Sequence, residues 1–264
     1  RACGYNLRGG DPHGACPECG TAVGFSLVDD RLKFADPGWV SRLAAGSGWI
    51  LTGLILYVLL WVVMAGFDDV IGGWRWAVQF FRSASLTLCI LLGCWLLTTG
   101  EPVERNRPDR RRLMARRIAV TSGIVGIGYL CLLTFYRGMD VGLWFVVGIA
   151  ALQTVLDVSE LVAMMLWVCV LLARMPSPRL SMQMRVVLIG LALHELGQWA
   201  GVFGGAWARW GVILSAWAGL ILGVWVVVLL FVFDSRLRAA VDEANDFWAR
   251  VRGQNELPRG GARG

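Results

Sequence analysis

Glu101–Arg117 (EPVERNRPDRRRLMARR) carries seven arginines in seventeen residues and separates two long apolar runs, which end at Thr99 and begin at Ile118. Each arginine is costly to place inside a bilayer. Basic loops of membrane proteins accordingly stay in the cytoplasm and set the orientation of the segments on either side. The stretch therefore predicts an all-α membrane protein with several spans.

The composition outside this loop supports lipid as the main solvent of the chain. Hydrophobic residues make up 56% of the 264 residues, charged residues 17%, and the mean hydropathy is +0.59. A soluble domain of this size would expose too much apolar surface. The net charge of +6 comes almost wholly from arginines beside apolar runs. This placement favours topology and anionic lipid over nucleic acid, which is not expected as a partner.

Six apolar stretches are each long enough for one crossing, since a helix rises about 1.5 Å per residue. We therefore expect a six-transmembrane-helix bundle over residues 48–233, preceded by a polar linker at 29–47. The expected spans are 48–66, 83–99, 118–136, 141–173, 186–205 and 211–233.

Residues 141–173 allow two interpretations. They would form a helix of roughly 50 Å, well beyond a hydrocarbon core of about 30 Å, and Asp157 and Glu160 interrupt them. They form either one long span or two short spans with a turn near Asp157. One span places the three arginines between Arg174 and Arg185 on the side of the arginine-rich loop, so it is favoured.

The distribution of charge over six spans predicts the topology. Twenty-one lysines and arginines fall on the side of the arginine-rich loop and four on the other. We therefore expect a multi-pass protein of the cell (inner) membrane with both termini in the cytoplasm.

Glycines recur every four residues in the last two spans, at Gly197, Gly201 and Gly205 and again at Gly219 and Gly223. Such faces allow close helix contacts, either within the bundle or between the protomers of a homo-oligomer.

Two of the expected spans carry polar groups. Gln153, Asp157 and Glu160 lie in 141–173, and His194, Glu195 and Gln198 lie in 186–205. Ionisable groups inside a membrane are expensive and indicate a functional site by default. The alternative is a carboxylate–imidazole pair that only joins the two helices.

The sequence around His194 (HELGQ) differs from a zinc-protease HExxH helix because glutamine replaces the second histidine. No catalytic residue is assigned.

The N-terminal segment has a metal-knuckle pattern. Cys16–Gly20 (CPECG) is a C-x2-C-G turn, in which the glycine permits a left-handed backbone. Cys3-Gly4 has the form of the second half of another knuckle, whose first cysteine would precede Arg1. With that residue the spacing is C-x2-C-G-x11-C-x2-C-G, which is typical of a four-cysteine zinc site.

These residues, Cys3–Gly9 (CGYNLRG) and Cys16–Gly20 (CPECG), resemble the CxxCGYxLRG…CPECG zinc ribbon of planctomycete-type membrane proteins. Those proteins place a small ribbon before a block of transmembrane helices, and their function is generally unassigned. The match covers about the first 25 residues and lacks the first cysteine.

A zinc-ribbon-like segment is thus expected over residues 1–28, with Cys3, Cys16 and Cys19 as ligands and His13 as an alternative fourth ligand. Four thiolates leave no open position on the metal, so the zinc is expected to be structural.

The C-terminal tail begins with a helical pattern. Residues 234–252 carry an apolar stripe of Leu237, Val241, Ala244, Trp248 and Val251. This amphipathic helix is expected to lie on the inner membrane surface or against the ribbon, and the alternative is a solvated continuation of the last span. Residues 253–264 are expected to be disordered.

Two functions follow from these patterns. The first is an interaction or regulatory protein without catalysis, whose tethered zinc ribbon binds a cytoplasmic protein. The alternative is a transporter or metal-dependent enzyme that uses Asp157, Glu160, His194 and Glu195.

Overall fold

The structure is a computed structural model. It describes residues 11, 14–20, 23, 32–66, 75–102, 109–135, 143–175, 178–203 and 208–256. This part of the chain forms one 3-10 turn and six long helices, which are η1 (Leu32–Phe34), α2 (Pro37–Gly66), α4 (Arg75–Leu97), α5 (Arg110–Phe135), α6 (Leu143–Ala173), α7 (Pro178–Phe203) and α8 (Ala208–Glu256).

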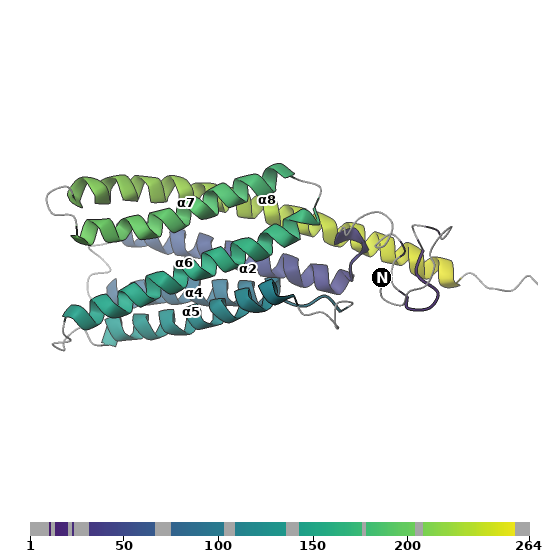
Figure 1. The fold of residues 1–264 in the computed structure, drawn as a ribbon, viewed down its shortest axis with the longest axis horizontal. Helices are drawn as coiled ribbons and strands as arrows, with labels where there is room; N and C mark the ends of the chain where they lie inside the picture. The colour runs from purple at the N-terminus through teal and green to yellow at the C-terminus, as the bar shows by residue number, and fades with distance from the viewer. Residues whose placement is uncertain are drawn as a thin grey trace, which may run out of the picture.

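The six helices lie side by side and alternate in direction (Figure 1). Each packs against its neighbours in the chain, and α8 also packs against α2, so the main contacts close a ring. The start of α2, the end of α4, the start of α5, the end of α6 and the start of α7 lie at one end of the bundle, called here the arginine-rich end (Figure 1). The helix α8 runs on past this end (Figure 1), and its last part, residues 234–256, which begins inside the bundle, is called the α8 extension.

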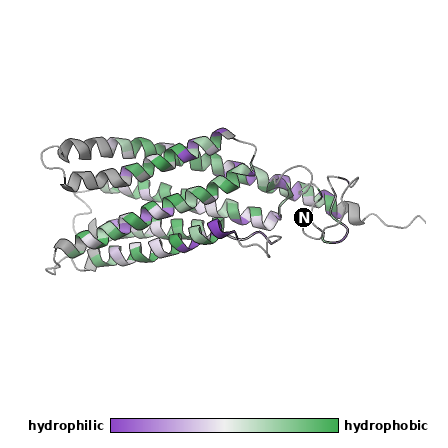
Figure 2. Ribbon diagram, viewed as in Figure 1, coloured by the Kyte–Doolittle hydropathy of each residue, from purple (hydrophilic) through white to green (hydrophobic). Residues whose placement is uncertain are grey.

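The outer surface of the bundle is apolar. Five helices, namely α2, α4, α5, α6 and α8, are long and apolar enough to cross a membrane. Hydrophobic residues dominate the bundle in Figure 2, and polar residues gather toward the arginine-rich end. Leu59, Phe81, Ile124, Ile221 and Phe231 are each more than half exposed. Soluble proteins rarely expose an apolar surface of this extent, so the chain is a multi-pass integral membrane protein.

The first helix begins eleven residues before the expected span, so the linker expected at 29–47 is wrong from Pro37 onward. Asp36 is the N-cap, because its carboxylate accepts a hydrogen bond of 2.8 Å from the Trp39 N–H, and Pro37 occupies the first helical position. Trp39 and Leu43 are then buried in the core. The Pro37-Gly38 pair therefore lies at the start of a helix.

Part of the arginine-rich loop is helical as well. Asp109 caps α5 by accepting a hydrogen bond of 2.9 Å from the Arg111 N–H. The helix begins at Arg110, eight residues before the expected span, so five of the seven arginines lie on its first turns.

Two further helices, α4 and α7, also begin earlier than the expected spans. α4 begins at Arg75 instead of residue 83, and α7 begins at Pro178 instead of residue 186. α6 is one continuous helix of 31 residues with no turn near Asp157.

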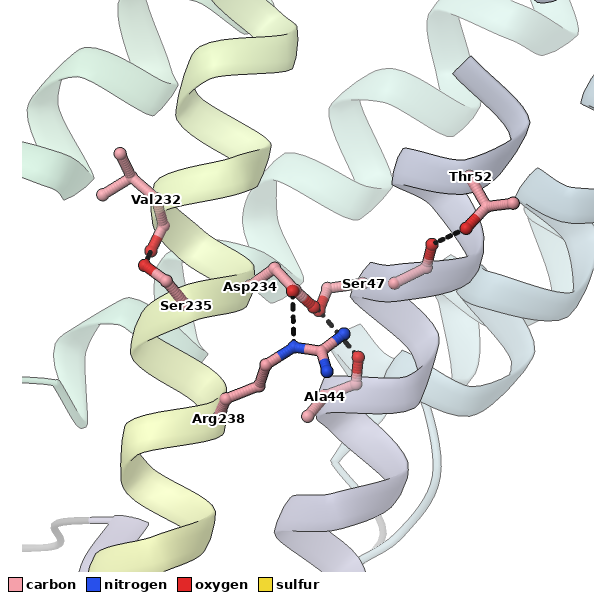
Figure 3. Close-up of polar contacts among 8 residues, drawn as sticks. Ala44, Ser47, Thr52, Val232, Asp234, Ser235 and Arg238 are labelled. Atoms are coloured by element: carbon pink, nitrogen blue, oxygen red, sulfur yellow. Dashed lines mark hydrogen bonds and ion pairs between the residues drawn. The ribbon is translucent and has the colours of Figure 1, made fainter. Parts of the chain in front are cut away.

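The tail is a continuation of the last span, the alternative given above, because α8 continues without interruption to Glu256. The expected boundary at Asp234 is absent since this acid is held inside the bundle. Ser47 of α2 donates a hydrogen bond of 2.7 Å to one carboxylate oxygen, and Arg238 donates one of 2.7 Å to the other (Figure 3). The disorder expected from residue 253 is likewise wrong as far as Glu256.

The α8 extension uses its apolar face to hold the N-terminal segment. Phe34 of η1 packs with Phe247 and Val251, and Ala15 and Trp248 lie against them. The Trp248 indole donates a hydrogen bond of 2.9 Å to the Ala35 carbonyl. This helix was expected either on the inner membrane surface or against the ribbon. Its contacts among the described residues are with the N-terminal segment.

Phe247→Ala should release this segment from the α8 extension. Loss of a buried phenylalanine costs about 3 kcal/mol, and about 1.4 kcal/mol already changes an equilibrium tenfold. We expect trypsin to cleave after Lys33 more than ten times faster, while the melting temperature of the bundle stays unchanged. Arg250→Ala, an exposed change on the same helix, is the control. Equal cleavage in both variants would contradict the packing.

The arginine-rich end is closed by polar contacts between α2, α4 and α6. The carbonyls at the end of α4 have no partner within that helix, and two tryptophans supply donors. Trp167 of α6 binds the Leu97 carbonyl at 2.8 Å, and Trp39 of α2 binds the Thr99 carbonyl at 2.9 Å. Arg174 forms an ion pair of 3.1 Å with Glu101.

Candidate functional site

A cavity of about 470 Å³ lies between the helices of the ring. All six long helices contribute side chains to it, and the two walls differ. The wall formed by α4, α5 and α6 carries the polar groups Thr87, Cys94, Ser122, Gln153, Asp157 and Glu160. The wall formed by α2, α7 and α8 is apolar, and consists of Ile50, Leu54, Met184, Val187, Leu191, Val226, Leu230 and Phe233.

Asp157 is held at the centre of the polar wall. Its Oδ1 atom accepts a hydrogen bond of 2.7 Å from Gln153 Nε2, one turn earlier on α6. The same atom accepts a second bond of 3.0 Å from the Ser122 hydroxyl of α5. Both hydrogen bonds hold the partly buried carboxylate at the cavity wall. They offset part of the cost of removing it from water.

Glu160 lies one turn after Asp157 on the same face of α6. The buried Cys94 thiol of α4 donates a long hydrogen bond of 3.7 Å to Glu160 Oε1. Across the part of the chain that the structure describes, neither Asp157 nor Glu160 has a cationic side chain within ion-pair distance. Two adjacent carboxylates therefore face the cavity without a protein counter-charge.

Gln153 contributes a further acceptor. Its Oε1 atom is buried without a hydrogen-bond donor, although its Nε2 atom is bonded to Asp157. A buried carbonyl oxygen without a donor is costly. The polar wall thus presents acceptors that need N–H or O–H groups.

The six polar residues singled out in the two expected spans do not all lie together. His194 does not line the cavity. Its ring lies on α7 against Gly219 of α8, since a Cβ atom at Gly219 would lie 2.7 Å from Nε2. The side chains of Glu195 and Gln198 lie outside the described residues. The structure therefore brings together Gln153, Asp157 and Glu160, and places His194 at a helix contact.

Sequence reasoning missed two members of the polar wall. The sequence pattern singles out neither Cys94 nor Ser122. A single serine or cysteine in an apolar helix carries no pattern that distinguishes cavity lining from simple packing. Only the neighbouring helix decides which of the two applies.

The N-terminal knuckle is described in part. Gly20 has φ of +68°, the left-handed conformation expected after the second cysteine, and its N–H bonds the Cys16 carbonyl at 2.9 Å. Cys16 is buried and Cys19 is exposed. Cys3 and His13 lie outside the described residues. The described residues contain no group of three potential metal ligands.

Comparisons with protein-family models, with curated proteins and with solved structures find no match for this chain. The fold and the cavity define its class, which is a multi-pass helical membrane protein with a polar, acid-bearing cavity between its helices.

Proposed function

We propose that this protein is a membrane-anchored interaction or regulatory module without catalysis, in which a cytoplasmic zinc ribbon is docked on six transmembrane helices. One observation carries the proposal, namely the packing of Ala15 and Phe34 against Phe247 and Val251 of the α8 extension. A ribbon held in this way transmits the force of a bound cytoplasmic partner to α8, and α8 continues through the bundle.

The proposed topology adds α7 as a span to the five candidate helices and places the protein in the inner membrane. The arginine-rich end and both termini then lie in the cytoplasm. The positive-inside rule supports it, since twenty-one of twenty-five basic residues fall on that side. In Figure 1 the starts of α2, α5 and α7, which carry many of these basic residues, lie at the same end of the bundle, and this arrangement supports the proposed orientation.

The zinc of this proposal is structural. The left-handed Gly20 and the neighbouring thiols Cys16 and Cys19 fit one knuckle of a ribbon. Cys3 and the residue before Arg1 would complete the four-thiolate set. Ligand thiolates and folding are coupled in such small segments, which have almost no core of their own.

Zinc content tests the ribbon. In a chain extended upstream by its natural residues, we expect one zinc ion per protein, lost when Cys16 and Cys19 are both changed to serine. The loss should also speed hydrogen exchange in residues 244–251, because the ribbon leaves the α8 extension. Cys169→Ser is the matched control. A chain without zinc, or with zinc that survives both changes, would refute the ribbon.

A second function is favoured by the cavity, namely binding or transport of a small molecule within the membrane. Asp157, Glu160 and Gln153 line one cavity of about 470 Å³, and pockets of about 300–1,000 Å³ suit drug-sized ligands. A metal-dependent enzyme is less well supported, since the described residues hold no three-ligand group. Saturable binding of any small amphiphile to purified protein tests this function.

A further inference from the structure

We propose that the cavity binds an amphiphilic organic amine in its cationic form. Its ammonium group lies against Asp157, Glu160 and Gln153, and its apolar part lies against the wall of α2, α7 and α8. The proposal rests on the second function above and names the class of its ligand.

Charge is the first reason. Asp157 and Glu160 face the same cavity one helical turn apart, and the described residues provide no cation within reach of either. Carboxylates in a poorly polar environment are costly unless a positive charge compensates them. A ligand cation supplies a charge that the described residues do not.

Hydrogen-bond chemistry is the second reason. The Oε1 atom of Gln153 is a buried acceptor without a donor, and it lies on the same face of α6 as Asp157. An ammonium that carries N–H groups can donate to this oxygen and to the carboxylates together. A quaternary ammonium has no such donor, so the ligand is a primary, secondary or tertiary amine.

The opposite wall is the third reason. It presents aliphatic side chains together with Phe233 and Met184, and Met164 and Met165 lie beside the acids on α6. Methionine side chains adapt to ligands of irregular shape. A small inorganic cation would leave this apolar space unused, whereas an amine with a hydrocarbon or aromatic body fills both parts.

The test uses dansylcadaverine, a fluorescent primary amine, and its neutral N-acetyl derivative, with full-length protein in nanodiscs. Empty nanodiscs correct for partition into lipid. We expect saturable binding of the amine and at least tenfold weaker binding of the acetylated probe. The double variant Asp157→Asn, Glu160→Gln should weaken amine binding at least tenfold, because the counter-charge is lost.

Two further variants separate this role from folding. Asp242→Asn removes an exposed acid of α8 and should bind like the parent protein. Gln153→Leu should weaken binding severalfold, since it removes the unsatisfied acceptor. Each variant is first shown to elute as the same species and to have the parent melting temperature or higher.

Other outcomes overturn the proposal in distinguishable ways. If the neutral probe binds as tightly as the amine, and the double variant binds both, the ligand-binding function stands and the cationic class is wrong. Displacement of the amine by sodium ions alone would assign the acids to an inorganic cation. If neither probe binds saturably, both the class and the second function fail.

Discussion

Gly46→Leu and Gly93→Leu are each expected to lower the free energy of unfolding by about 3 kcal/mol, the upper part of the usual range for overpacking. α2 and α4 cross at these glycines. A Cβ atom at Gly46 would lie 2.8 Å from the Gly93 carbonyl oxygen and 2.9 Å from the Leu97 nitrogen, and one at Gly93 would lie 2.7 Å from the Gly46 carbonyl oxygen. Backbone atoms cannot rotate away, so the helices must separate.

The same substitution at open glycines provides the control. Added Cβ atoms at Gly128 of α5 and Gly223 of α8 meet nothing within 4 Å. Gly128→Leu and Gly223→Leu should be neutral or stabilising, because glycine inside a helix costs roughly 0.5–1 kcal/mol relative to alanine. Thermal or denaturant unfolding in detergent measures all four variants. Equal losses at crossing and open positions would show that the α2–α4 contact is not close.

Arg174→Met should also be strongly destabilising, by about 3 kcal/mol. Removing one partner of a buried ion pair leaves the other charge in a poorly polar site. The side chains of Glu101 and Arg174 are only 2% and 11% exposed, and the guanidinium also lies 5.0 Å from the centre of the Trp39 ring. Loss of the cation therefore removes a charge partner and a ring contact at once.

The double variant Glu101→Leu, Arg174→Met identifies the cause of this loss. Replacing both charges by apolar groups is often close to neutral, so most of the stability should return. Arg238→Ala is the comparison for a pair whose cation is exposed, since the Arg238 side chain is 66% exposed. It should change stability less, because Asp234 keeps its hydrogen bond from Ser47. A double variant as unstable as Arg174→Met would show that packing, and not the unpaired charge, is responsible.

The sequence predicted which residues are candidates for the site, but not which of them lie together. Ionisable groups in apolar runs are rare, so Asp157, Glu160 and His194 were visible as candidates. Their spacing placed Asp157 and Glu160 on one face of a helix, which the structure confirms in the cavity. The sequence does not give the rotation of one helix relative to another. It therefore could not show that His194 faces Gly219 of α8 and does not line the cavity with these acids.

Helix contacts show the same limit. The sequence pattern directed attention to repeated glycines, yet the close crossing of α2 and α4 uses Gly46 and Gly93, which belong to no shared repeat and of which Gly46 falls in the expected linker. A glycine permits close approach only where a partner helix passes, and its sequence neighbours do not determine that.

The sequence by itself determined that lipid surrounds most of the chain, that the chain is helical, and roughly where its apolar segments lie. These properties depend on composition and on the cost of placing charges and unpaired backbone groups in lipid. It also predicted the left-handed Gly20, which is a local requirement of the turn. The tertiary structure decided that the first turns of α2 are packed in the core and that α8 continues through Asp234, since Trp39 and Leu43 are buried and Ser47 binds this acid. It also decided that Ser122 and Cys94 share a cavity with two carboxylates, because that arrangement depends on contacts between residues far apart in the chain.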